Sequence, residues 1–293
     1  MIPDLTGLWV PVVTPLDADD QVDAEALGRL ARRLLDQGCS GLVALGTTGE
    51  PATLRLDERR DVVDVCAEAC AAAGKPLMVG VGSNCTQSTM EEVAAFEGTP
   101  ALTAFLVVVP YYTRPAVAGT VDHFRAVAAA SETPIVVYNV PYRTGRGLDA
   151  DALVELAGTP RIVGVKQAVG ALDHDTLELM RQKPPEFQVL AGDDAFIAPT
   201  ILMGGSGAIA ASAHVCTDLF ARMIHASLAG ASDTEESSRV VDRPDPLITR
   251  RPPDSPRSTR PAPPFGRPLR LARGPRDGVR SRSASGPVRP RAA

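Results

Sequence analysis

Short runs of consecutive apolar residues recur along the chain, with amphipathic segments between them. The runs are rich in valine, isoleucine and leucine, as is typical of strands buried on both faces of a sheet. The segments between them place alanine, leucine, glutamate and arginine at helical spacing. We count eight strand candidates, at residues 8–14, 41–46, 77–81, 104–110, 135–140, 162–166, 188–191 and 207–211. The clearest helices are expected at residues 23–37, 56–73, 117–130 and 173–182.

This alternation of strand and helix favours a parallel sheet. Eight such units between residues 8 and 229 predict an α/β fold of the (β/α)8 TIM-barrel type rather than an open, doubly wound sheet, which usually has fewer strands. Asp23 and Gly38 are expected to cap the two ends of the first helix. Catalytic groups of such barrels lie at the carboxyl ends of the strands, so the last residues of each apolar run are where we look for chemistry.

The composition changes abruptly after about residue 237. Residues 239–293 hold 12 of the 26 prolines and 14 arginines, with only four acidic residues. Interior prolines break helices, so we divide the chain into a catalytic barrel at residues 1–236 and a tail at residues 237–293 that we expect to be disordered. A frameshifted reading of a GC-rich gene would give such a tail.

Bulk features exclude several other classes of protein. The apolar runs are too short to cross a bilayer and no signal segment precedes them, which predicts a cytoplasmic protein without membrane contact. The five cysteines and four histidines lack metal-ligand spacing, so we expect no metal and expect Cys66 and Cys70 to be buried free thiols. The barrel segment is acidic, and only the arginine-rich tail suits nucleic acid or another polyanion.

Lys166 is the first candidate for chemistry. The chain has three lysines, and Lys75 and Lys183 lie beside prolines in expected surface turns. Lys166 ends an apolar run, where partial desolvation disfavours the ammonium form and provides a neutral amine that can attack a carbonyl carbon. A lysine held in a salt bridge, or one that extends to solvent, fits its position equally well.

Tyr138 ends another apolar run, and its phenol would reach the same mouth of the barrel. A core tyrosine with a satisfied hydroxyl is the simpler interpretation of Tyr138 alone. The sequence Gly-Thr-Thr-Gly-Glu at residues 46–50 suits backbone amides that bind a carboxylate, and equally a plain turn with a threonine cap. The glycine-rich residues 204–207 precede a strand and lack the Lys-Ser/Thr of a nucleotide-binding loop, so we expect no nucleotide.

Taken together, these positions resemble a known family. The motifs begin at Val43 (Val-Ala-Leu-Gly-Thr-Thr-Gly-Glu), Val109 (Val-Pro-Tyr-Tyr), Tyr138 (Tyr-Asn-Val-Pro-Tyr-Arg-Thr-Gly), Gly164 (Gly-Val-Lys) and Ala191 (Ala-Gly-Asp-Asp). They are similar, in order and between about residues 8 and 229, to those of the dihydrodipicolinate synthase and N-acetylneuraminate lyase family of pyruvate aldolases.

The resemblance implies a class I aldolase that needs no cofactor, because the substrate pyruvate forms an imine with Lys166. It implies a proton relay of Tyr138, Thr47 and Tyr112, in which Tyr112 is lent across a dimer interface. A homodimer or homotetramer is therefore expected. The resemblance also implies helices packed beside the barrel after its last strand. The tail takes their place, and we expect it to disturb the assembly. The resemblance also implies that backbone amides near Thr47, Thr48 and Ile209 hold the pyruvate carboxylate. Gly192 is a further substrate-binding residue that it implies.

Arg143 resembles the synthase branch of this family, in which a guanidinium grips the carboxylate of aspartate semialdehyde. The alternative is a structural salt bridge. Four neighbours depart from the family pattern, and we expect them to surround the pocket for the second substrate: Gln167, Val169, Pro51 and Tyr142. Leu56 and Arg59 stand where lysine-inhibited synthases carry histidines, so we expect little inhibition by free lysine.

Three hypotheses follow. The first is a 4-hydroxy-tetrahydrodipicolinate synthase, a lyase that condenses pyruvate with aspartate semialdehyde in lysine and diaminopimelate biosynthesis. The second keeps the imine chemistry with another aldehyde, as in a 2-keto-3-deoxy sugar acid aldolase. The third is a catalytically impaired barrel whose basic tail binds a polyanion, although that tail has a single aromatic residue, Phe265, for stacking.

Overall fold

Eight parallel strands form a closed barrel in the computed structural model, which describes residues 2–230. The tail at residues 237–293, its boundary with the barrel domain, its expected disorder and its suitability for polyanions lie outside the described residues. The strands are β1 (Gly7–Pro11), β2 (Gly41–Ala44), β3 (Leu77–Val81), β4 (Leu102–Val108), β5 (Ile135–Asn139), β6 (Ile162–Gln167), β7 (Gln188–Ala191) and β8 (Gly207–Ile209).

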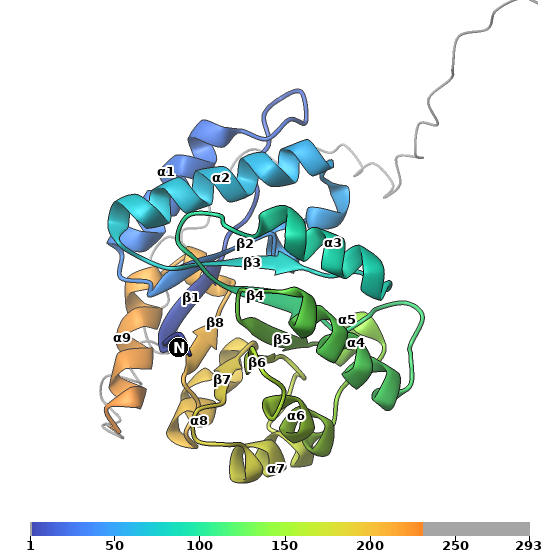
Figure 1. Cartoon of the computed structure of the whole chain (residues 1–293). Helices are drawn as coiled ribbons and strands as arrows, with labels where there is room; N and C mark the ends of the chain where they lie inside the picture. Colours follow the sequence, from blue (N-terminus) through green and yellow to red (C-terminus); the bar gives the residue numbers. More distant parts are fainter. Residues whose placement is uncertain (1, 231–293) are drawn as a thin grey trace, which may run out of the picture. The chain divides into compact units, whose positions relative to one another are not determined.

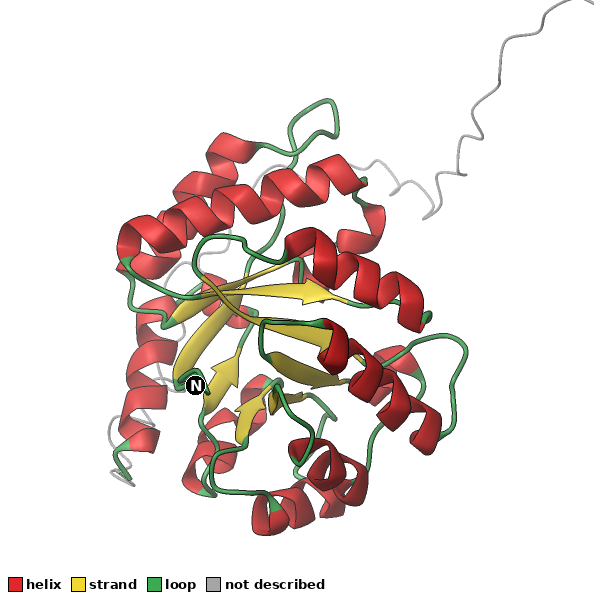
Figure 2. Cartoon of the chain, in the orientation of Figure 1, coloured by secondary structure: helices red, strands yellow, loops and turns green. Residues whose placement is uncertain are grey.

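Helices surround this barrel on its outside (Figures 1 and 2). The α-helices are α1 (Ala24–Asp36), α2 (Leu56–Ala73), α3 (Thr86–Phe96), α4 (Val117–Ala130), α5 (Pro141–Thr144), α6 (Ala150–Ala157), α7 (His174–Gln182), α8 (Ile197–Leu202) and α9 (Thr217–Leu228). Short 3-10 turns are η1 (Thr47–Gly49), η2 (Pro51–Thr53), η3 (Asp194–Phe196) and η4 (Ser212–His214). No helix within residues 2–230 is both long and apolar enough to cross a membrane.

The barrel closes where β1 pairs in parallel with both β2 and β8. Every other strand pairs with its two neighbours in chain order, so the strand order is the sequence order. The predicted TIM-barrel fold is confirmed. This closure brings the carboxyl ends of all eight strands to one mouth, although the residues there are far apart in sequence.

Alternate residues of each strand serve two separate cores. Trp9, Val43, Met78 and Leu190 point inward and fill the barrel, whereas neighbours such as Leu42 pack between the strands and the helices. The inner core is tight, since a Cβ at Gly41 would lie 2.5 Å from the Trp9 ring. Each fully buried leucine or valine contributes about 1.5–3 kcal/mol to folding.

Several strands end earlier than their apolar runs predict. β1 ends at Pro11 rather than residue 14, β2 at Ala44 rather than residue 46, and β8 at Ile209 rather than residue 211. In β2 the cause is local, because Leu45 has a φ of +54° and turns the chain out of the ladder. Leu45 stays buried after the strand has ended. An apolar run therefore predicts burial here better than it predicts strand length.

The predicted helices are confirmed to within one residue at each end, and two of them, α2 and α4, agree with the expected bounds. The Asp23 carboxylate accepts a hydrogen bond from the Ala26 amide at 2.8 Å and caps α1, which contributes about 1 kcal/mol. Gln37 is the cap residue at the other end, and Gly38 follows it with a φ of +97°. Cys66 and Cys70 are buried free thiols, as expected.

Candidate active site

Neighbouring strands place Lys166 beside Tyr138 at the mouth of the barrel. Tyr138 of β5 is in register with Lys166 of β6. Residues in register on adjacent parallel strands point to the same side of the sheet, and Tyr138 belongs to the inner core. The Lys166 Nζ lies 4.3 Å from the centroid of the Tyr138 ring. Both side chains are buried, with 7% and 6% of their surface exposed.

The Lys166 amine has no acidic partner in contact with its charge, which lies over the Tyr138 ring. It forms no hydrogen bond and no salt bridge with any residue between 2 and 230. Burial lowers the pKa of Lys166 to about 8, Asp193 and Asp194 oppose this shift, and Arg143 adds to it. The salt-bridged lysine considered from the sequence is therefore wrong. A substantial share of neutral amine is present near pH 8.

The Tyr138 phenol sits among polar groups although its ring is buried. Burial raises the pKa of Tyr138, and a hydrogen bond with the Thr47 side chain lowers it. Arg143 also lowers this pKa, and Asp193 raises it. With a raised pKa the phenol stays protonated at neutral pH, so it can donate a proton and then recover it.

The loop after β2 brings Thr47 to this phenol. Thr47 begins the turn η1, which is capped by Gly46 without a hydrogen bond from a threonine side chain. The threonine-capped turn considered from the sequence is therefore wrong. The first amides of a helical turn have no partner within it, and those of Thr47 and Thr48 are thus able to bind an anion.

A cavity of about 460 Å³ opens beside these groups. Thr47, Tyr138, Arg143 and Tyr112 all line it, so the structure brings these four predicted residues together. Tyr112 and two further lining residues, Leu45 and Glu50, have positive φ angles although they are not glycines, a strain that tends to gather at functional sites.

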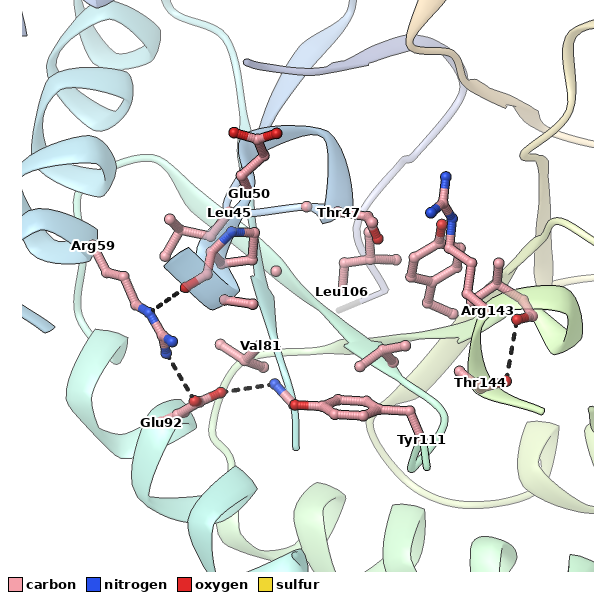
Figure 3. Close-up of a pocket in the computed structure, with 18 of the residues that line it drawn as sticks. Leu45, Thr47, Glu50, Arg59, Val81, Glu92, Leu106, Tyr111, Arg143 and Thr144 are labelled. Atoms are coloured by element: carbon pink, nitrogen blue, oxygen red, sulfur yellow. Dashed lines mark hydrogen bonds and ion pairs between the residues drawn. The ribbon is translucent and has the colours of Figure 1, made fainter. Parts of the chain in front are cut away.

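Figure 3 shows that Arg143 and Arg59 lie at opposite ends of this cavity. The far end is closed by an ion pair, in which Arg59 Nη1 lies 3.1 Å from Glu92 Oε1. Arg59 also donates to the Pro51 carbonyl at 2.9 Å, and Glu92 accepts from the Gly82 amide at 2.8 Å. The sequence motifs did not single out Glu92, which lies in the middle of α3.

The remaining predicted residues have different surroundings. Tyr112 is 88% exposed in the single chain. Ile209 lies in the inner core with Tyr138. The Gly192 amide already donates to the Gln167 carbonyl at 2.8 Å. A Cβ at Gly192 would lie 2.5 Å from the Ala168 Cβ, so close strand packing explains this glycine.

Gln167 does not border the second-substrate pocket, and our expectation from the sequence was wrong. The side chain follows the inward Lys166 and therefore points outward, toward the helices. It accepts from Asn139 Nδ2 at 3.0 Å and donates to Thr176 Oγ1 at 3.1 Å. Of the other departures, Pro51 lines the cavity, whereas Val169 and Tyr142 do not, so the expectation was wrong for them as well. The Tyr142 ring is exposed, and its centroid lies 5.5 Å from the Arg143 Cζ.

Known proteins match this chain in sequence and in fold. A sequence model of the dihydrodipicolinate synthetase family matches residues 4–248. The chain belongs to this family. It is thereby an enzyme of the lyase class, as the sequence predicted, and the family resemblance of its motifs is confirmed.

Two relatives illustrate the match. The 4-hydroxy-tetrahydrodipicolinate synthase of Moorella thermoacetica is 39% identical over 223 residues, which cover 75% of this chain and 74% of that protein. The chloride-inhibited dihydrodipicolinate synthase of Acinetobacter baumannii, whose structure is a complex with pyruvate, is 32% identical with a TM-score of 0.76. That alignment covers 80% of this chain and 79% of the other.

Proposed function

We propose that this enzyme is a 4-hydroxy-tetrahydrodipicolinate synthase that condenses pyruvate with L-aspartate 4-semialdehyde through a lysine imine. The observation that carries the proposal is the buried, unpaired Lys166 amine 4.3 Å from the Tyr138 ring. A buried amine of lowered pKa is the nucleophile that imine chemistry needs. The proposal requires no cofactor or metal.

The covalent steps follow from these positions. The neutral Lys166 amine attacks the carbonyl carbon of pyruvate, and the resulting carbinolamine loses water to give a cationic iminium. Tyr138 gives the departing hydroxyl its proton and recovers one later, with Thr47 as its hydrogen-bonded neighbour. The pyruvate methyl then loses a proton to the same relay. The enamine so formed attacks the aldehyde carbon, whose oxygen takes a proton from the relay. The amino group contributed by aspartate semialdehyde then attacks the iminium carbon, which closes the ring and releases Lys166 as the free amine.

Binding roles are proposed for the groups around the relay. The amides of Thr47 and Thr48 at the start of η1 bind the pyruvate carboxylate, with the backbone near Ile209 as a further contact. Gly192 contributes through its carbonyl or its lack of a side chain, because its amide is already bonded. The Arg143 guanidinium binds the carboxylate of the aldehyde substrate.

Tyr112 connects catalysis to assembly. Tyr112 is 88% exposed and has a strained backbone with a φ of +71°. An exposed aromatic side chain of this kind is typical of a surface that contacts another protein. Tyr112 borders the cavity of its own chain, yet its side chain is exposed, and we propose that its phenol reaches the site of a second copy of the chain and completes the relay there, so that a homodimer is the smallest active unit. Two such dimers would form the homotetramer.

The residues that line the cavity also support a different aldehyde substrate in place of aspartate semialdehyde. Between its two arginines the lining is mainly apolar, with Val81, Leu106 and Val108 among its members. A less polar or longer aldehyde than aspartate semialdehyde would also fit the volume of about 460 Å³.

Steady-state condensation assays separate these options. We expect pyruvate-dependent consumption of aspartate semialdehyde, with kcat/KM at least about tenfold above that of sugar-derived or hydrophobic aldehydes. Arg143→Gln should raise KM for aspartate semialdehyde more than KM for pyruvate. A preference for another aldehyde that survives Arg143→Gln would overturn the synthase assignment and leave the imine chemistry intact.

A further inference from the structure

Two adjacent acidic residues follow β7, the strand that pairs with β6 on the side away from Tyr138. Asp193 and Asp194 follow β7, whose Leu190 is in register with Lys166. Asp193 is half-buried, and its Oδ2 accepts a hydrogen bond from the Gly170 amide at 2.8 Å. Asp194 accepts a hydrogen bond from the Ser212 hydroxyl. The pair thus joins the loops that follow β6, β7 and β8.

Negative and positive side chains lie on opposite sides of Lys166. Asp193 and Asp194 lie on the β7 side and Arg143 on the β5 side, next to the uncharged Tyr138 and Thr47. Asp193 and Arg143 influence both Lys166 and Tyr138, with opposite signs. Neither acid forms a salt bridge with Lys166, although both act on its charge.

We propose that Asp193 is a positioning residue that fixes the loop after β6 through Gly170 and keeps the nitrogen of Lys166 cationic throughout the imine stage. The inference rests on the proposed function. An imine accepts electrons from the pyruvate methyl group only while its nitrogen is protonated, and an imine holds that proton less firmly than the parent amine. A fixed negative charge nearby therefore protects the step in which the methyl proton leaves.

Asp193→Asn tests this role with little structural change. An asparagine keeps an oxygen that can accept the Gly170 hydrogen bond, so only the charge is lost. Asp173→Asn is the matched control, because Asp173 caps α7 in the loop after β6 and asparagine caps helices equally well. Asp194→Asn and Arg143→Gln complete the series.

The first measurement is competitive acetylation of the full-length protein with acetic anhydride across pH, resolved by peptide. Lys75 and Lys183 serve as internal references. We expect a midpoint near pH 8 for Lys166, lowered by about 0.5–1 pH unit in Asp193→Asn. The shift should be smaller in Asp194→Asn, absent in Asp173→Asn and reversed in Arg143→Gln.

The second measurement is deuterium exchange into the pyruvate methyl group without any aldehyde, followed by proton NMR. Asp193→Asn should slow exchange at pH 8 by about three- to tenfold, in spite of its more available amine. An unchanged midpoint for Lys166, or unchanged exchange with a shifted midpoint, would overturn the inference. If the wild type does not exchange the methyl protons at all, the proposed function fails, whereas the labelling series still decides whether Asp193 acts on Lys166.

Discussion

Lys166 and Gln167 are consecutive residues on β6, almost equally buried, and yet their surroundings are opposite. Gln167 points toward the helices, where its carboxamide bonds to Asn139 and Thr176. Lys166 points into the barrel mouth and has no hydrogen bond with the described residues. One strand thus has a structural side, on which polar groups are satisfied, and a chemical side, on which an amine is left available.

Removal of the Tyr138 hydroxyl should give the largest effect on the chemical side. Tyr138→Phe keeps the ring beside Lys166 but removes the proton donor, so kcat for condensation should fall by about 10²–10³-fold. Reductive trapping of pyruvate on Lys166 should persist at a lower rate. Full condensation activity in Tyr138→Phe would show that another group transfers the proton.

Replacement of Lys166 by an apolar side chain should stabilise the fold. The folded pKa of about 8 lies below the unfolded value of 10.5, so the unfolded state binds more protons and the penalty is complete below about pH 8. Lys166→Met should raise the free energy of unfolding by about 1–3 kcal/mol at pH 7 and by less at pH 10.5. Urea titrations at the two pH values measure this difference, and equal values would contradict the account.

An apolar side chain at position 167 should lower the free energy of unfolding instead of raising it. Gln167→Leu removes the acceptor for Asn139 Nδ2 and the donor to Thr176 Oγ1, which keep only their bonds to the Leu148 backbone and to Asp173, and it should lower the free energy of unfolding by about 1–3 kcal/mol. The same urea titrations measure this change. A stable Gln167→Leu enzyme would mean that the outer side of β6 is not held by this network.

The weakest response is expected from free lysine. Arg59 brings a positive charge to the far end of the cavity, where it is already engaged by Glu92 and the Pro51 carbonyl. An added ammonium group would be repelled there, so lysine should inhibit weakly or not at all. Half-inhibition at sub-millimolar lysine would refute this.

The contrast on β6 also explains what the sequence could predict. Lys166 and Tyr138 were found because each is a polar residue at the end of an apolar run, where a barrel presents side chains to its mouth. Side chains alternate along a strand, so the outward direction of Gln167 follows from the inward direction of Lys166. The family motif nevertheless led us to expect Gln167 at the pocket for the second substrate. The links from Asp193 to Gly170 and from Arg59 to Glu92 join different loops, and no spacing within one segment reveals them.

Incubation with pyruvate and borohydride, followed by peptide mapping, tests the central claim most directly. Borohydride adds hydride to an iminium and fixes the adduct on the lysine that formed it. With only three lysines in the chain, the mass must appear on the peptide of Lys166 and be lost in Lys166→Ala. An adduct on Lys75 or Lys183 alone, or none on a folded protein, would contradict the account.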